Sequence, residues 1–208
     1  LTAVCRAHGV RELALLRPLG TDQATATVSI TREALLSAPA PGPGGRVAWA
    51  EPAGPRIWIF EDGRVTPLNV RRGIVPPAPQ AVAWETGDAL LVADRVLGLV
   101  RLDLRSGEGM RPALPPRSSL VDLTSIVAVA EGEFVATQAG MWPSRVVRIR
   151  LAPGDDSIAA VEVLESGHPA MGAPAGACVT PDGAILFLAN PGWSNLESGG
   201  RSRPVAIM

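Results

Sequence analysis

The fold is decided by residues 81–107, AVAWETGDALLVADRVLGLVRLDLRSG, a stretch that holds two strand patterns and the turn between them. Residues 90–93 form an unbroken apolar run that ends at Asp94, which is the pattern of an inner strand buried on both faces. Residues 99–105 then alternate between apolar and charged side chains, which is typical of a half-buried outer strand. Because a short turn containing Gly98 joins the two, they are expected to pair as antiparallel neighbours.

The same order of patterns returns further along the chain. Residues 126–151 repeat a leading strand, a buried strand and an alternating strand, and a third copy begins at Ala177. When the buried runs LLVAD, FVATQ and LFLAN are laid over one another, Asp94, Gln138 and Asn190 share one position. A repeat of about 40 to 50 residues with four short strands is typical of propeller blades, because one blade cannot bury both of its faces alone.

We therefore predict an all-β protein with a single β-propeller domain over residues 1–208, built from four-stranded blades of the six-bladed type. About five blade equivalents are expected. Their approximate bounds are residues 1–37, 45–78, 79–118, 119–168 and 169–208. The chain begins with Leu and stops within a strand pattern, so we expect a fragment or processed product. An incomplete ring would leave an exposed blade edge, which favours self-association.

Composition restricts the class of partner. The chain has 208 residues, of which 47% are hydrophobic and 19% charged, so it can bury a globular core. Its net charge of −1 gives no electrostatic attraction to nucleic acid or an anionic membrane, and we expect neither as a partner. All 19 basic residues are Arg, which suggests a GC-rich, bacterial genome. Cys5 and Cys178 have no second cysteine nearby, so a CxxC metal site is excluded.

A family resemblance rests on two phrases. Residues 89–107, ALLVADRVLGLVRLDLRSG, resemble a blade of the gluconolactonase, regucalcin and senescence-marker-protein group, and of the NHL-repeat propellers near it. Residues 174–190, PAGACVTPDGAILFLAN, resemble the leading loop and inner strand of a later blade in that group. The resemblance covers about half of the chain, mainly residues 79–208, and is more specific for fold than for activity.

The resemblance implies a six-bladed propeller with one divalent cation, usually Ca²⁺, at the mouth of the central channel. In that group a Glu and Asn or Asp residues hold the cation, which polarises a lactone carbonyl while an Asp assists proton transfer. This sequence departs from the pattern at two positions, where Gln80 replaces an expected Asn and Ala175 an expected Asp. Because Ala175 has no side-chain oxygen, its position can neither bind a metal nor move a proton.

Six residues are candidates for binding a ligand in the central channel: Asp94, Gln138, Asn190, Trp142, Trp193 and Gln80. Asp94 and Asn190 are also the candidate metal ligands, for Ca²⁺, because both follow buried strands and offer oxygen atoms. The alternative interpretation is that polar residues at strand ends cap backbone groups. The two tryptophans lie in loops after buried strands, where an aromatic side chain can stack on a ligand.

Two functions remain open. The first is cation-dependent hydrolysis of lactones or related esters; the second is a non-catalytic propeller that binds a small molecule or a protein. No catalytic residue is assigned, since GxSxG and HExxH motifs are absent and the two histidines, His8 and His168, have no evident partners. The number of carboxylates around the channel distinguishes the two functions. Three or more oxygen ligands favour the hydrolase, and fewer than two favour the binding protein. The compartment is not assigned.

Overall fold

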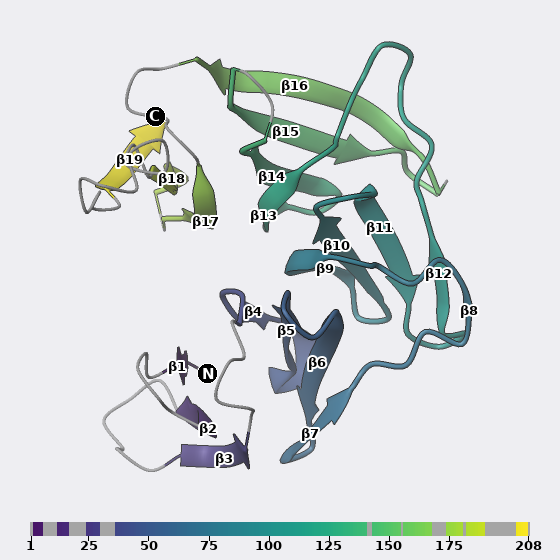
Figure 1. Ribbon diagram of the computed structural model, residues 1–208, viewed down its shortest axis with the longest axis vertical. Helices are drawn as coiled ribbons and strands as arrows, with labels where there is room; N and C mark the ends of the chain where they lie inside the picture. Colours follow the sequence, from purple (N-terminus) through teal and green to yellow (C-terminus); the bar gives the residue numbers. More distant parts are fainter. Residues whose placement is uncertain are drawn as a thin grey trace.

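The computed structural model describes residues 36–140, 143–154, 156–167, 174–180 and 182–189, together with the backbone of strands at 2–5, 12–16, 24–29 and 203–207. Its strands form five sheets that follow one another around an arc (Figure 1). Within each sheet, paired strands run antiparallel, with one parallel exception described below. This arrangement confirms the predicted all-β propeller.

The bounds of the strands are as follows. The first sheet contains β1 (Thr2–Cys5), β2 (Glu12–Leu16) and β3 (Ala24–Ser29), and the second β4 (Ala40–Pro41), β5 (Val47–Glu51), β6 (Arg56–Glu61) and β7 (Arg64–Pro67). The third contains β8 (Arg72–Gly73), β9 (Pro79–Thr86), β10 (Ala89–Asp94), β11 (Gly98–Asp103) and β12 (Glu108–Met110). The fourth contains β13 (Leu123–Ala130), β14 (Glu133–Gln138), β15 (Arg145–Leu151) and β16 (Ile158–Ser166), and the fifth β17 (Ala175–Val179), β18 (Ile185–Ala189) and β19 (Arg203–Ile207). A short 3₁₀ turn, Pro43–Gly45, joins β4 to β5.

The sheets differ from the predicted blade units at two short strands. Residues 38–44 lie between the first two predicted units, yet Ala40 and Pro41 form β4, which pairs with β5. Residues 72–73 fall in the predicted second unit, yet β8 pairs parallel with β12 of the third sheet. Both strands have only two residues, which is too few for a periodic sequence pattern. They are strands only because each pairs with a longer neighbouring strand.

The predicted order of strands across a blade needs one correction. Residues 90–93 were expected to form an inner strand, but β10 is the second strand from the centre of the arc (Figure 1). The innermost strand is β9, which contacts β5 of the sheet before and β13 of the sheet after. All six residues of β10 are buried, because neighbouring sheets cover both of its faces. An apolar run in the sequence therefore indicates that both faces of the strand are covered. It does not indicate how far the strand lies from the channel.

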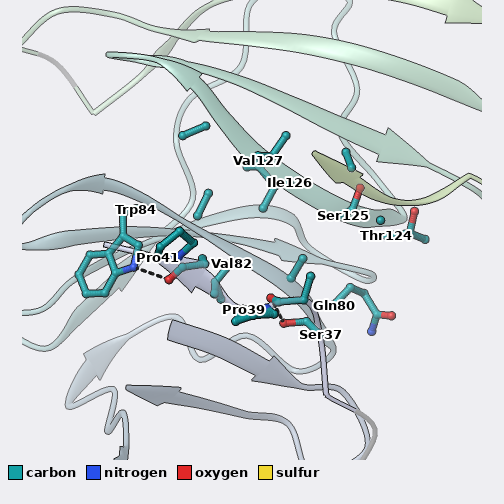
Figure 2. Close-up of a pocket in the computed structure, with 17 residues that line it drawn as sticks. Ser37, Pro39, Pro41, Gln80, Val82, Trp84, Thr124, Ser125, Ile126 and Val127 are labelled. Carbon is teal, nitrogen blue, oxygen red and sulfur yellow. Dashed lines mark hydrogen bonds between the residues drawn. The ribbon is translucent and has the colours of Figure 1, made fainter. Parts of the chain in front are cut away.

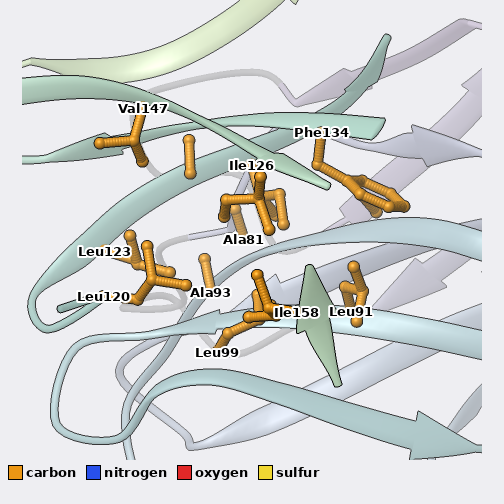
Figure 3. Packing of buried hydrophobic residues seen from close by; sticks show 13 residues of the cluster. Ala81, Leu91, Ala93, Leu99, Leu120, Leu123, Ile126, Phe134, Val147 and Ile158 are labelled. Carbon is orange, nitrogen blue, oxygen red and sulfur yellow. The ribbon is translucent and has the colours of Figure 1, made fainter. Parts of the chain in front are cut away.

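Alternating side chains join each sheet to both of its neighbours. Ala81 and Leu91 of the third sheet point toward the fourth, where they pack in one cluster with Ile126 and Phe134 (Figure 3). Val82 belongs to a different cluster, between the second and third sheets. Since successive strand residues point to opposite faces, each inner sheet contributes to two cores and none is stable alone.

Turns fix the register between strands. The Asp62-Gly63 pair joins β6 to β7 with φ of 50° and 75°. Positive φ at both central residues is the type I′ geometry that matches the twist of a hairpin. In the part of the chain with described placement, no helix has the length and apolar surface needed to cross a membrane. Self-association through a sheet edge stays a prediction.

Candidate functional site

A cavity of about 310 Å³ lies along the innermost strands of four consecutive sheets (Figure 2). Its described walls come from β4, β9, β13 and β17 and from residues 37–39, which precede β4. Because these are the strands nearest the centre of the arc, the cavity occupies the channel side of the propeller (Figure 1). Its volume is within the range typical of small-molecule sites.

Small apolar side chains make up most of the described wall. They are Ala38, Pro39, Ala40, Pro41, Ala81, Val82, Ala83, Ile126, Val127, Ala128 and Ala177. The polar side chains Ser37, Gln80, Thr124 and Ser125 gather toward one end, and the indole of Trp84 lies at the other (Figure 2). None of the described lining residues carries an ionisable side chain.

The indole of Trp84 is held from two sides. Its Nε1 donates a hydrogen bond to the Ala40 carbonyl oxygen at 3.0 Å, which ties β9 to β4. The Arg46 guanidinium carbon lies 4.7 Å from the centroid of the ring, a cation–π distance. The ring is therefore a fixed wall of the cavity, and its N–H is already engaged.

Three β-bulges occur at the same place on three innermost strands. In β9, Pro79 pairs with Asp94 and Ala81 with Ala93, which leaves Gln80 as an extra residue. The equivalent extra residues are Thr124 in β13 and Gly176 in β17. All three line the cavity. A bulge re-aims the side chain that it inserts, so the repeated bulge supplies the cavity with one residue from each strand.

Three hydroxyl groups converge beside the bulge of β13. Thr124 and Ser125 both lie opposite Thr137 of β14, with oxygen–oxygen distances to Thr137 Oγ1 of 2.8 Å and 2.6 Å. Thr124 Oγ1 also donates to the Pro174 carbonyl oxygen at 2.7 Å, which joins the fourth sheet to the segment leading into the fifth. Thr124 and Ser125 line the cavity, whereas Thr137 is fully buried behind them.

Asp94 and Gln138 end the second strands of their sheets and are both fully buried. Asp94 Oδ1 accepts from the N–H groups of Val96 and Leu97, each at 2.8 Å, and Oδ2 accepts from that of Ala78 at 2.7 Å. Gln138 Nε2 donates to the Val121 carbonyl oxygen at 2.8 Å. Neither residue is among those lining the cavity. Both side chains thus fasten the segment that leads into the innermost strand of their own sheet.

Gln80 is the one described candidate that lines the cavity. Its Nε2 donates to the Ala78 carbonyl oxygen at 3.1 Å, which leaves the second N–H and Oε1 for other partners. Ala175, where the resembled group has an Asp, begins β17. Asn190, Trp142 and Trp193 lie outside the described residues, as do His8 and His168.

The described residues do not fit a Ca²⁺ site. Calcium in proteins takes six to eight oxygen ligands, commonly including carboxylates, whereas the described cavity wall contains no carboxylate. Both oxygens of Asp94 already accept hydrogen bonds from backbone N–H groups. Over the residues with described placement, no group of three or more His, Cys, Asp or Glu side chains is arranged to hold a metal ion. Ca²⁺ binding therefore stays a prediction without support from these contacts.

Sequence reasoning missed Ser37, Thr124, Ser125 and Thr137 as residues of the site and its support. The available signal was the pair Thr124-Ser125 at the start of a strand that is otherwise apolar as far as Ala130. Hydroxyl residues are common at strand ends, so this signal alone does not separate a binding wall from a turn.

Comparison in sequence identifies no relative: no family model matches the chain, and no curated protein matches it. Comparison in structure finds many similar folds. One is a chain of the nidogen/laminin complex, with 14% identity and a TM-score of 0.65 over 95% of this chain and 70% of that one. Another is a gluconolactonase from Xanthomonas campestris, with 14% identity and a TM-score of 0.62 over 84% of this chain and 59% of that one.

A third similar structure is the WD40 β-propeller domain of Doa1, with 10% identity and a TM-score of 0.56. The match covers 85% of this chain and 54% of that one. At these identities the likeness establishes the propeller fold, which proteins of unrelated function share. The chain spans between about half and 70% of the length of these three structures.

Proposed function

We propose that this protein binds a small, uncharged and largely apolar molecule in the channel cavity. The observation that carries the proposal is the composition of the described wall, in which small apolar side chains surround four polar groups that bear no charge. Concave, mostly apolar sites with a few placed polar groups are the usual form of small-molecule sites. A charged ligand would lose its hydration there without gaining a described partner of opposite charge.

Lactone hydrolysis is the weaker candidate. It is supported by the resemblance to the gluconolactonase group and by a gluconolactonase among the similar structures, but that likeness reaches only the fold. The chemistry of that group needs carboxylates around the channel, and the described wall has fewer than two. By the criterion set above, the described residues favour the binding protein.

The test is titration calorimetry with naphthalene and with 2-naphthoate, which has a similar ring but carries a negative charge. We expect saturable binding of naphthalene and none of 2-naphthoate. Binding of the anion in preference to the hydrocarbon would contradict the proposal. So would failure of every uncharged mono- or bicyclic probe to bind.

A matched pair of variants locates the site. Ala128 lines the cavity and has an exposed side chain, so Ala128→Trp should fill the cavity without disturbing the core and should abolish naphthalene binding. Ala130 is exposed on the same strand and is not among the described lining residues, so Ala130→Trp should leave binding unchanged. Equal effects of both variants would place the ligand elsewhere.

A further inference from the structure

The hydroxyl cluster behind the cavity wall has a defined direction of proton donation. Three hydroxyl groups, on Thr124, Ser125 and Thr137, supply three protons. Three contacts of 2.8 Å or less need a proton: Thr124 with the Pro174 carbonyl oxygen, Thr124 with Thr137 Oγ1, and Thr137 with Ser125. A fourth contact, between Thr124 Oγ1 and the Thr137 carbonyl oxygen, is longer at 3.2 Å. One proton is therefore available for each of the three short contacts.

The direction follows from the first of these contacts. The Pro174 carbonyl oxygen can only accept, so the Thr124 proton lies on the 2.7 Å contact between them. Thr137 must then donate to Thr124 across 2.8 Å, and Ser125 must donate to Thr137 across 2.6 Å. Any other assignment, including donation from Thr124 to the Thr137 carbonyl oxygen at 3.2 Å alone, leaves two oxygen atoms at 2.8 Å or less with no hydrogen between them, which is repulsive.

The consequence for the cavity is that its hydroxyl groups present lone pairs. The protons of Thr124 and Ser125 are both directed away from the cavity, although both residues line it. Ser37, the third hydroxyl of the wall, is likewise committed, because its Oγ donates to the Ala38 carbonyl oxygen at 3.0 Å. An oxygen atom with its proton engaged accepts a hydrogen bond and repels an acceptor.

We propose that the Thr124–Ser125 wall is a hydrogen-bond-accepting subsite that selects uncharged apolar ligands carrying a hydroxyl or N–H donor over ligands of the same shape that carry only an acceptor. This selectivity rests on the proposed binding function. Thr137 acts as a positioning residue, since it is fully buried and holds the Ser125 proton away from the ligand.

The test compares two probes of similar shape. 2-Naphthol offers a donor, whereas 2-methoxynaphthalene has only an acceptor oxygen, and 2-ethylnaphthalene controls for the size of the ether. Titration calorimetry should give an affinity for 2-naphthol about tenfold higher than for the ether, the scale of one hydrogen bond gained against one unpaired polar contact. The ether should bind more weakly than 2-ethylnaphthalene, because its oxygen faces another acceptor.

Two variants assign the effect to the hydroxyl chain. Ser125→Ala should reduce the preference for 2-naphthol, because only Thr124 Oγ1 then remains as an acceptor in this wall. Thr137→Val keeps the shape of the buried side chain but frees the Ser125 proton, so it should raise the affinity for 2-methoxynaphthalene. A structural role of Thr137 alone would lower binding of all three probes together.

The outcomes are separable. Equal affinities of unchanged protein for 2-naphthol and the ether overturn the donor selectivity and leave the proposed binding function standing. If no probe binds, both the function and the selectivity are wrong. A preference for the ether in the unchanged protein would mean that Ser125 donates into the cavity, which overturns the assigned direction.

Discussion

The backbone N–H of Ala78 donates to Oδ2 of Asp94 at 2.7 Å, and this bond fastens the start of β9 to the end of β10. In the next sheet Gln138 fastens the equivalent segment, but as a hydrogen-bond donor instead of an acceptor. Its Nε2 donates to the Val121 carbonyl oxygen just before β13. A carboxylate and an amide therefore hold equivalent segments. This relationship is consistent with the capping interpretation of both residues.

Removing the Asp94 carboxylate should destabilise the protein. Asp94→Ala removes a fully buried carboxylate and leaves three partly buried backbone N–H donors without their acceptor, which should lower the free energy of unfolding by about 3 kcal/mol. Asp94→Asn should cost less, because one amide oxygen still accepts. Urea unfolding measures both. The control is Asp88→Ala, which removes only an exposed ion pair with Arg105 and should change stability by less than about 1 kcal/mol. Equal effects at the two positions would contradict the cap.

Calcium should leave the stability unchanged. A ligand that binds only the folded state raises the melting temperature, and the described channel wall offers no carboxylate that would hold a cation. We expect the same melting curve with millimolar Ca²⁺ and with a chelator. A rise in melting temperature that disappears in Asp94→Ala would instead establish the metal site suggested by the family resemblance.

Gly98 should tolerate no side chain. Its φ is 83°, and a Cβ atom there would lie 2.0 Å from the Leu120 carbonyl oxygen of the segment that leads into the next sheet. Gly63 has a similar φ of 75° but open space around it. Gly63→Ala should therefore cost about 1 kcal/mol from backbone strain alone.

Gly98→Ala should lower the free energy of unfolding by at least about 1 kcal/mol more than Gly63→Ala does. The reason is that its new Cβ atom overlaps with backbone atoms in addition to straining its own backbone. Denaturant unfolding of the two variants gives the difference. If the two free energies of unfolding agreed, the segment that leads into the fourth sheet would not be in contact with Gly98.

Stability should decline with acid partly through Asp103. Its Oδ1 accepts a hydrogen bond from the Ser106 N–H at 2.7 Å, and bonds from the backbone and side chain of Ser106 lower the pKa of this carboxyl below its ordinary value. Because the pKa is lower in the folded than in the unfolded state, the stabilisation is complete above the ordinary Asp range of about 4 and is lost as the pH falls through the folded pKa.

The measurement is unfolding free energy against pH for the unchanged protein and for Asp103→Asn. The stability difference between them should shrink as the pH falls from about 5 to below the folded pKa. Ser106→Ala, which removes the hydroxyl but keeps the backbone N–H, should raise the pKa of Asp103 part of the way in an NMR titration. A carboxyl pKa unaffected by Ser106→Ala would exclude the hydroxyl as a cause.

The channel site was only partly predictable from sequence. The equivalence of Asp94 and Gln138 is visible in the aligned runs LLVAD and FVATQ, and both do end the second strand of their sheets. The sequence does not show that these two residues lie away from the cavity. An apolar run looks the same in the innermost strand of a sheet and in the strand next to it when both faces are covered. Gln80 was identified from the family resemblance, in which it replaces an expected Asn, whereas Thr124 and Ser125 are residue types common at strand ends and were not identified.

The sequence by itself determined the local structure: the strands, their alternating faces and the Asp62-Gly63 turn, since each depends on neighbours within a few residues. The propeller repeat also followed from local patterns, because every copy carries them. Only the tertiary structure decided that β9 and β13 line the channel, that Gln80, Thr124 and Gly176 are bulged, and that the hydroxyl groups of Ser125 and Thr137 are in contact. These features depend on which strand pairs with which and in what register, and that is fixed by packing between sheets rather than by any single stretch of chain.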